Sequence, residues 1–263
     1  LGIRKNMVEA LRCWIEAFQI ASPTDSGWKL SPIGRLIFSP SQGLDPFLED
    51  HSTNWLLHWL ISTNTQTPFF AWECLFNRWP TVEFSASSVL EAYRRESERN
   101  PKPISGVTMK QHWEVFLHSY CPPRTRKDED HLDCVLSVLG LIEEIGERQN
   151  DAGRWETLYA FDSSHKTAIP QQLFAFFIHD WWNRAFPLEL TVSLQELVAG
   201  NHSPGRILRM PESEILSRIS DLSKTHGNMF QTTETANLRL LRRLRQSDGH
   251  EDLRRAYNNP RFI

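Results

Sequence analysis

Residues 87–120 read SSVLEAYRRESERNPKPISGVTMKQHWEVFLHSY and predict two helices joined by a tight connector. In the first helix, over 87–99, glutamates and arginines recur four residues apart, which is typical of a solvated helix face. Pro101 and Pro103 mark the connector. The second helix turns one apolar stripe toward a core, and this stripe consists of Met109, Trp113, Phe116 and Tyr120.

The elements after this pair complete a recurring order. A third helix is expected over 130–139, and residues 141–145 and 155–161 are expected to form strands around a turn at 150–153. Helix, turn, helix, helix and hairpin is the order of a winged-helix unit, in which one helix enters a groove of DNA. The sequence therefore predicts a winged-helix-like unit over 86–165.

A further unit of this kind is expected at the N-terminus, over 1–85, together with buried helices. An amphipathic helix is predicted over 5–20, and short strands are predicted over 28–30 and 36–38. A helix followed by a hairpin is only the second half of a winged-helix unit, because a preceding helix is needed to fix its angle in a groove. We therefore expect that the chain begins inside a longer domain. The apolar stripe of the N-terminal helix consists of Val8, Leu11, Ile15 and Phe18.

The remaining segments are predicted to be helical and rich in aromatic residues. Residues 55–61 read WLLHWLI, which predicts a helix buried on all sides, and another aromatic helix is expected over 69–79. A C-terminal helical unit with a basic tail is expected over 166–263, with its closing helix over 235–246. No sequence repeat is evident. The expected fold class is mainly α with short β-hairpins (α+β), with tandem winged-helix-like units packed around a central aromatic-rich helical region.

The composition is that of a folded globular protein, with 40% hydrophobic and 23% charged residues among 263. Because the formal net charge is −3, nucleic-acid binding would need a local basic patch. Residues 239–263 supply one, with seven arginines against three acidic residues. No apolar run has the length of a membrane span, the first residues have no signal-peptide character, and the four cysteines are scattered. A cytoplasmic location is therefore expected.

Carboxylates and imidazoles gather between Asp45 and His58. Glu49, Asp50 and His58 could serve metal-assisted hydrolysis if the fold brought them into one cleft. A helix that begins with Asp50 or Ser52 as its N-cap, with Glu49 favoured by the helix dipole, explains the same residues without chemistry. The chain also has no Walker loop and no GxGxxG, HExxH or GxSxG motif. We therefore predict no catalytic residues and no cofactor.

Two His-x-x-Cys pairs have the spacing of zinc ligands. They are His118 with Cys121, and His131 with Cys134. Cys121 stands at the end of a predicted helix, where a cysteine can simply pack against its neighbours. Because short motifs of this kind often occur by chance, no metal site is predicted.

DNA contacts are expected from basic and amide side chains on exposed helix faces. The N-terminal helix, the second helix of the 86–165 unit and the closing C-terminal helix each offer such side chains. An ordinary solvated face, or a surface for an acidic partner, would explain the C-terminal arginines equally well. The predicted DNA-contacting residues are Lys5, Asn6, Arg12, Lys110, Gln111, Arg239, Arg242 and Arg243.

Seven segments, in the same order along nearly the whole chain, carry a family resemblance. They are LGIRKNMV (1–8) continuing to Trp14, SPIG (31–34), DPFLED (45–50), TNWLLHW (53–59), FN (76–77), EDHLDC (129–134) and SPGR (203–206). With these segments the chain resembles the bacterial family called domain of unknown function 4007. It departs from the family at Arg4, where a small residue is usual, and at Phe47, where tyrosine is frequent.

The resemblance implies an association rather than a reaction. Family members usually have a few dozen residues before the Leu-Gly start, which agrees with the expected longer domain. They often occur beside a cysteine desulfurase and a phosphosulfate-reductase-like sulfurtransferase, in clusters linked to DNA phosphorothioation and phage defence. The family offers no catalytic residues that could be carried over to this chain.

Three hypotheses follow from the sequence. The first is a winged-helix DNA-binding accessory protein of a DNA sulfur-modification or phage-defence system, which binds double-stranded DNA and recruits or positions it for a sulfur-transferring partner. The second is a scaffold that docks partner enzymes without contacting DNA. The third is a cryptic metal-dependent nuclease that uses Glu49, Asp50 and His58.

Overall fold

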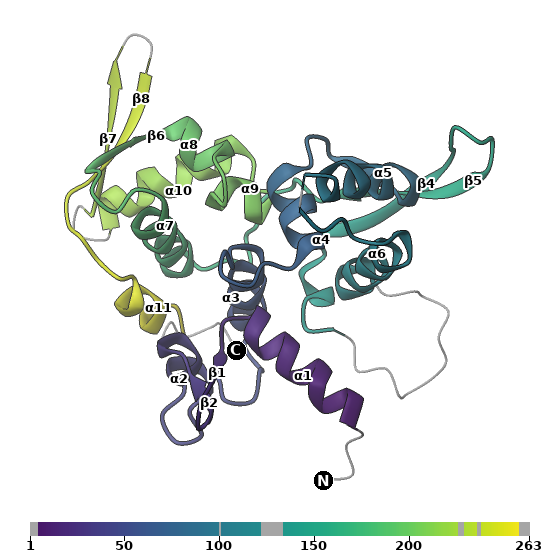
Figure 1. Cartoon of the computed structure of the whole chain (residues 1–263). Coiled ribbons are helices and arrows are strands. Elements are labelled where there is room, and N and C mark those ends of the chain that lie inside the picture. Colours follow the sequence, from purple (N-terminus) through teal and green to yellow (C-terminus); the bar gives the residue numbers. More distant parts are fainter. Residues whose placement is uncertain (1–4, 100, 122–133, 226–228, 236–237, 258–263) are drawn as a thin grey trace. The chain divides into compact units, whose positions relative to one another are not determined.

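The protein is mainly helical, with small antiparallel sheets of two or three strands, which confirms the predicted α+β class. The chain divides into two compact units (Figure 1): the first unit comprises residues 1–68 and 165–263, and the second unit comprises residues 69–164. In the part of the chain that is described, no helix combines the length and apolar character needed to cross a bilayer. The computed structural model describes residues 5–99, 101–121, 134–225, 229–235 and 238–257.

In the described part of the second unit, helices pack against a three-stranded sheet with the strand order β3-β5-β4. Trp72, Phe76 and Phe116 lie at its centre, and each is almost completely buried. The predicted hairpin over 141–161 is confirmed by β4 and β5. The elements are α4 (Phe70–Trp72), the π-helical segment η1 (Glu73–Arg78), β3 (Glu83–Ser85), α5 (Ala86–Ser97), α6 (Gly106–Tyr120), the 3₁₀ turn η2 (Ser137–Leu139), β4 (Ile142–Gln149) and β5 (Trp155–Phe161).

The C-terminal part of the first unit repeats this order of elements. A helix leads into a short strand, two further helices follow, and a hairpin closes a sheet with the strand order β6-β8-β7. In both sheets the short strand pairs with the second strand of the hairpin: β3 pairs with β5, and β6 pairs with β8. Each short strand runs directly into a helix, which has Ser85 as its N-cap in the second unit and Ser193 in the first. The elements are α7 (Gln171–Ala185), β6 (Thr191–Ser193), α8 (Leu194–Ala199), the additional helix α9 (Pro204–Leu208), α10 (Glu212–Thr225), β7 (Phe230–Thr235) and β8 (Leu238–Arg243).

The N-terminal part of the first unit is built around α3, in which ten of twelve residues are buried, as its sequence predicts. Trp59 of α3 stacks on Phe177 of α7 with ring centroids 4.8 Å apart, and its indole nitrogen donates to Asp180 over 2.6 Å. This contact joins the N-terminal helices to the C-terminal part of the same unit. The elements are α1 (Lys5–Ala17), β1 (Ala21–Thr24), β2 (Gly27–Leu30), α2 (Pro32–Phe38), α3 (His51–Ser62) and, from the C-terminus, α11 (His250–Tyr257).

Two Ser-Pro turns start the helices α2 and α9. Ser31 and Ser203 each accept a hydrogen bond from a backbone N–H three residues on, and the following proline is the first helical residue. A glycine follows in both turns, because a Cβ on Gly34 or Gly205 would overlap a backbone carbonyl oxygen of an earlier segment. These two Ser-Pro motifs therefore have a structural role, because they start a helix and let it pack closely against an earlier segment. The strand expected over 36–38 is wrong, because this turn begins a helix there.

Two further expectations are corrected. The closing helix expected over 235–246 is instead the central strand β8, where backbone pairing on both sides and the burial of Leu241 outweigh the helical spacing of the leucines. Of the helix expected over 130–139, residues 130–133 lie outside the described residues, and the rest contains only η2.

Candidate nucleic-acid interface

The outward face of the β6-β8-β7 sheet gathers polar side chains around one arginine. Arg242 lies on the central strand β8, directly opposite Thr191 of β6 and Gln231 of β7. All three side chains are exposed, as is Thr233, two residues further along β7 on the same face. We call Thr191, Gln231, Thr233 and Arg242 the arginine face. Arginine, threonine and glutamine are the side-chain types that contact phosphate and sugar in DNA complexes.

Charge distinguishes the two units. The second unit carries 11 lysines and arginines against 16 aspartates and glutamates, a net charge of −5, whereas the first unit carries 18 against 16, a net charge of +2. The hairpins differ in the same sense. Residues 229–245, around β7 and β8, have a net charge of +3, and residues 142–156, from β4 to the start of β5, have a net charge of −3. Since DNA is a polyanion, the hairpin of the first unit is the better candidate to contact it.

Arg243 does not belong to this surface, although the sequence predicts a DNA contact there. Its side chain is 4% exposed and points into the first unit, because β8 is a strand in which neighbouring residues face opposite ways. The guanidinium donates to the Asn183 side chain and to the Pro187 carbonyl, each over 2.8 Å, and lies over the ring of Trp182. Arg243 therefore holds the sheet against α7.

The other predicted contacts lie on three elements. Asn6 and Arg12 are exposed on α1, and Arg239 is exposed on β8. The side chain of Lys5 lies outside the described residues. The predicted apolar stripe of α1 is only partly packed, because Phe18 is buried whereas Leu11 is 53% exposed. Lys110 and Gln111 are exposed on α6 of the acidic second unit, where Lys110 lies 3.9 Å from the Glu114 carboxylate.

The acidic segment before α3 is a helix cap. Asp45 is buried and accepts hydrogen bonds from the backbone N–H groups of Glu49 and Asp50, over 2.8 and 3.0 Å, and from the hydroxyl of Thr53. Asp50 is the N-cap of α3, as predicted, and accepts from the Ser52 N–H. Glu49 is exposed, while His58 lies two turns further along the helix in the core. Glu49, Asp50 and His58 are therefore not gathered into one cleft.

His58 and His179 are both completely buried in the first unit, and both are held neutral. His58 donates from Nε2 to the Ile207 carbonyl over 2.9 Å. Burial, with Arg209 and Lys166 nearby, lowers the pKa of His58 to about 3 despite this hydrogen bond. Burial and the charge of Arg243 lower the pKa of His179 to about 4, against the opposing effect of Asp248. These groups have the character of core histidines.

We predict that acid destabilises the first unit, because burial lowers the pKa values of His58 and His179. Their imidazoles take up protons below about pH 6.5 in the unfolded chain but resist protonation in the folded chain down to about pH 4, so the free energy of unfolding falls as the pH drops through this range. We expect His179→Gln to flatten this dependence by up to about 1.4 kcal/mol per pH unit. Urea unfolding at several pH values measures it, with the exposed His118→Gln as the control. Equal slopes in both variants would contradict the assignment.

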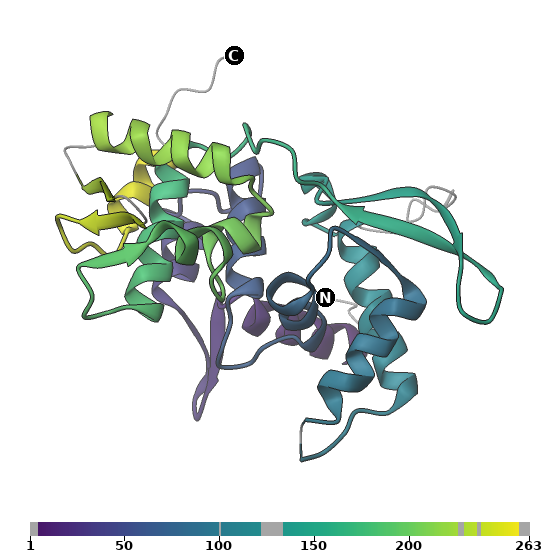
Figure 2. The ribbon, with the colours of Figure 1, turned by 90° about the horizontal axis from the view of Figure 1, so that it is seen from above.

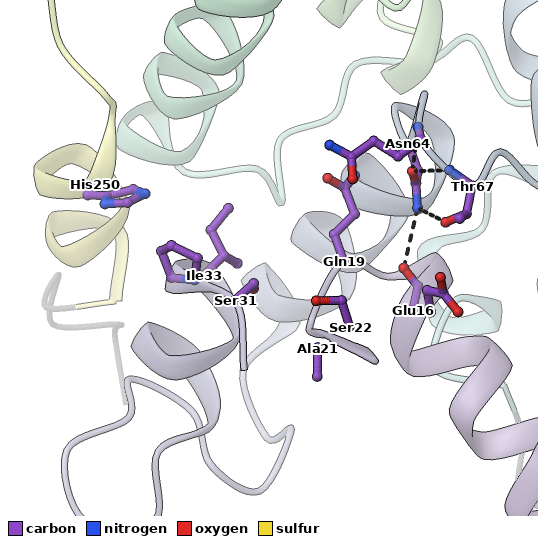
Figure 3. A pocket seen from close by; sticks show the side chains of 11 residues that line it. Glu16, Gln19, Ala21, Ser22, Ser31, Ile33, Asn64, Thr67 and His250 are labelled. Atoms are coloured by element: carbon purple, nitrogen blue, oxygen red, sulfur yellow. Dashed lines mark hydrogen bonds between the residues drawn. The ribbon is translucent and has the colours of Figure 1, made fainter. Parts of the chain in front are cut away.

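A pocket of about 330 Å³ opens in the first unit between the end of α1, the start of α2 and α11 (Figure 3). At one end of it the amide of Asn64 donates to the carbonyls of Glu16 and Ala17 and to the Thr67 hydroxyl, over 3.1 to 3.3 Å. The Asn64 oxygen accepts the N–H groups of the next turn. The ionisable residues in the described lining are Glu16 and His250, so the described lining offers no lysine or arginine to a phosphate.

The structure describes three of the four residues of the two His-x-x-Cys pairs. His118 is exposed near the end of α6, and Cys121 is the C-cap of this helix. Cys134 begins the next described stretch, and His131 lies outside the described residues. Among the described residues, no cluster of three or more potential ligands that could hold a metal ion is found.

Fold and surface together define an α+β protein that contains two modules with the same order of elements. The acidic module is the second unit, and the basic module is formed by α7 to β8 of the first unit. Their hairpins have net charges of opposite sign. The chain belongs to the family described as "Protein of unknown function (DUF4007)", whose model matches residues 1–257. This match confirms the family resemblance drawn from the sequence. No curated protein matches the chain.

Two solved structures share this fold. A magnesium ion-bound crystal structure of SspB is similar to the chain with a TM-score of 0.85 and 24% sequence identity, over 98% of this chain and 77% of the SspB chain. Another crystal structure of SspB gives a TM-score of 0.81 and 23% identity over the same shares. At this identity the similarity establishes the fold.

Proposed function

We propose that the chain is a DNA-binding accessory protein of a bacterial DNA sulfur-modification or phage-defence system. It acts in the cytoplasm, contacts double-stranded DNA through the first unit, and positions the DNA for a sulfur-transferring partner. The observation that carries the proposal is the arginine face on the sheet of the basic module. The exposed Arg245, two residues after β8, adds positive charge to the hairpin, whereas Arg239 lies opposite Glu234 of β7 and on the other face of the strand from Arg242.

The order of elements supports a DNA-binding role. We interpret both repeated modules as winged-helix units, in which α6 and α10 take the place of the groove-binding helix and the hairpins are the wings. The exposed positions of α10 include Ser213, Ser217, Ser220 and Lys224, which can donate to phosphates and base edges. On α6, Val107 and Val115 are exposed and Lys110 faces Glu114, which suits DNA less well.

The nature of the system rests on the family resemblance. Proteins of this family often occur beside a cysteine desulfurase and a phosphosulfate-reductase-like sulfurtransferase, and we propose these two enzymes as partners. The similarity to SspB supports a shared architecture across the matched 77% of the SspB chain. A metal-dependent nuclease that uses Glu49, Asp50 and His58 has no comparable support, since Asp50 caps α3 and His58 is sealed in the core.

Fluorescence anisotropy with a short labelled duplex tests the DNA contact. We expect binding that weakens steeply between about 50 and about 200 mM salt, because bound phosphates release counterions. Arg242→Ala combined with Arg245→Ala should weaken binding at low salt at least about tenfold and reduce the slope of log K against log salt by about two.

The matched control is Arg94→Ala combined with Arg95→Ala. This pair is also exposed, but it lies on α5 of the acidic unit, 2.7 and 3.9 Å from the Glu91 carboxylate. We expect the control to bind like the unchanged protein. If both double variants keep the same affinity and salt slope, the arginine face does not contact DNA. Arg243→Ala is unsuitable as a test, because it removes buried hydrogen bonds.

A further inference from the structure

Trp155 is the most exposed tryptophan in the described part of the chain, with 67% of its surface accessible. It begins β5, opposite Gln149 of β4, on the ribbon that extends beyond the helices of the second unit (Figure 2). Ile145, at the bulge of β4, is 46% exposed on the same ribbon. Tryptophan is enriched among the few residues that dominate the binding energy of protein interfaces, so an indole exposed in this way is a candidate anchor.

The structure holds this ribbon in a fixed position. The Glu156 carboxylate accepts hydrogen bonds from the hydroxyls of Ser85 and Ser87, each over 2.6 Å, and from the Ser87 backbone N–H over 3.0 Å. Arg148 of β4 donates to the same carboxylate over 3.2 Å and to the Ser85 hydroxyl over 2.7 Å. Trp155 is therefore presented by a braced ribbon, which lowers the entropy lost when it binds a partner.

The charge of the ribbon indicates what can bind there. Glu143, Glu144 and Glu147 are exposed on β4, and residues 142–156 carry a net charge of −3. This charge repels a nucleic acid and attracts a basic surface. An occupant should therefore combine a recess large enough for the indole with neighbouring arginines.

The first unit of the same chain has this combination. A pocket of about 260 Å³ lies between α10 and β7, lined by Ser223, Phe230, Gln231, Thr232 and Leu244. A cavity of about 150 Å³ is enough to hold benzene, so the volume suffices for an indole, and the polar side chains Gln231 and Thr232 can accept its N–H. Arg242 pairs with Gln231 across the sheet, and Arg245 follows Leu244 in the chain. The exposed Arg242 and Arg245 therefore lie on the same hairpin as the pocket.

We propose that copies of this chain associate head to tail, with Trp155 of one copy seated in the β7–α10 pocket of a second copy. The glutamates of the β4 strand then face Arg242 and Arg245 of the other copy. Such an interface is heterologous, because it joins two different surfaces, and each copy keeps one surface of each kind for the next. Association of this kind grows with concentration and weakens with salt.

Sedimentation velocity of two variants, alone and mixed, tests the proposal. Trp155→Ala with Glu147→Lys removes the acidic surface, and Arg242→Glu with Arg245→Glu removes the basic one. We expect the unchanged protein to form oligomers as its concentration is raised to about 100 μM. Each variant alone should stay monomeric over the same range. An equimolar mixture should form a dimer and stop there, because only one intact pair of surfaces remains.

Two results would overturn the proposal. One is an unchanged protein that stays monomeric over the whole concentration range at low salt. The other is a mixture that stays monomeric, or variants that each still associate alone, since the contact would then use other residues. Anisotropy separates this proposal from DNA binding: Trp155→Ala should abolish oligomers while leaving duplex affinity at nanomolar protein unchanged, and excess duplex should dissociate the oligomers by competing for Arg242 and Arg245.

Discussion

Replacing Asp45 with alanine is expected to lower the free energy of unfolding of the first unit by about 3 to 5 kcal/mol. The carboxylate is buried and accepts two backbone N–H groups ahead of α3 together with the Thr53 hydroxyl. The Thr53 hydroxyl also lies 2.9 Å from the Tyr257 hydroxyl of α11. The loss of stability should therefore extend to this C-terminal helix. Each buried donor left without a partner costs about 1 to 3 kcal/mol. Urea denaturation followed by circular dichroism measures the change.

Glu49→Ala is the matched control for Asp45→Ala. It removes an exposed carboxylate from the same segment, and we expect a change within about 0.5 kcal/mol. DNA affinity should be retained in both variants at temperatures where they are folded, because the segment is a cap. A loss below about 1 kcal/mol for Asp45→Ala would show that the cap does not hold the N-terminal helices in place.

Replacing Trp72 with alanine is expected to have a similarly large effect in the second unit, about 3 to 5 kcal/mol. Its ring is 1% exposed and meets the ring of Phe116 with centroids 5.1 Å apart. Its indole nitrogen donates to the Tyr120 hydroxyl over 2.8 Å, so the substitution leaves a cavity and removes this buried hydrogen bond. Thermal and urea unfolding of the variant measure the loss.

Two controls separate burial from the chemistry of tryptophan. Trp72→Phe keeps most of the ring but loses the hydrogen bond, and we expect it to cost about 1 to 2 kcal/mol. Trp155→Ala removes the same side chain from an exposed position and should cost less than about 0.5 kcal/mol. Equal losses at Trp72 and Trp155 would mean that the core of this unit is not centred on the α4–α6 contact.

Local patterns predict much of the fold. The all-round apolar run of α3, its Asp50 cap and the hairpin of β4 and β5 follow from period, capping and turn chemistry. The Ser-Pro signal that starts α2 was present in the sequence at Ser31, and its proper reading as a helix start would have replaced the expected strand. The spacing of Leu238, Leu241 and Leu244 fits a helix as well as a strand, and only pairing with β6 and β7 decides between them.

The candidate site was predictable only in part. The sequence marks the C-terminal arginines, but the register of β8 sorts Arg242 outward and Arg243 inward, and register depends on residues more than 50 positions away in β6. The bracing of the ribbon by Glu156 joins residues 69 and 71 positions apart. The exposure of Trp155 is equally hidden, since tryptophans in this chain are mostly buried.

The repeated order of elements has a consequence for the engineering of the protein. Two sheets share one strand connectivity, with no evident sequence repeat, so this topology tolerates very different surface side chains. Because the two hairpins differ in the charge of their outward side chains, those side chains can be exchanged between the hairpins without touching either core. The surface of each hairpin can therefore be redesigned while the fold of its module is kept.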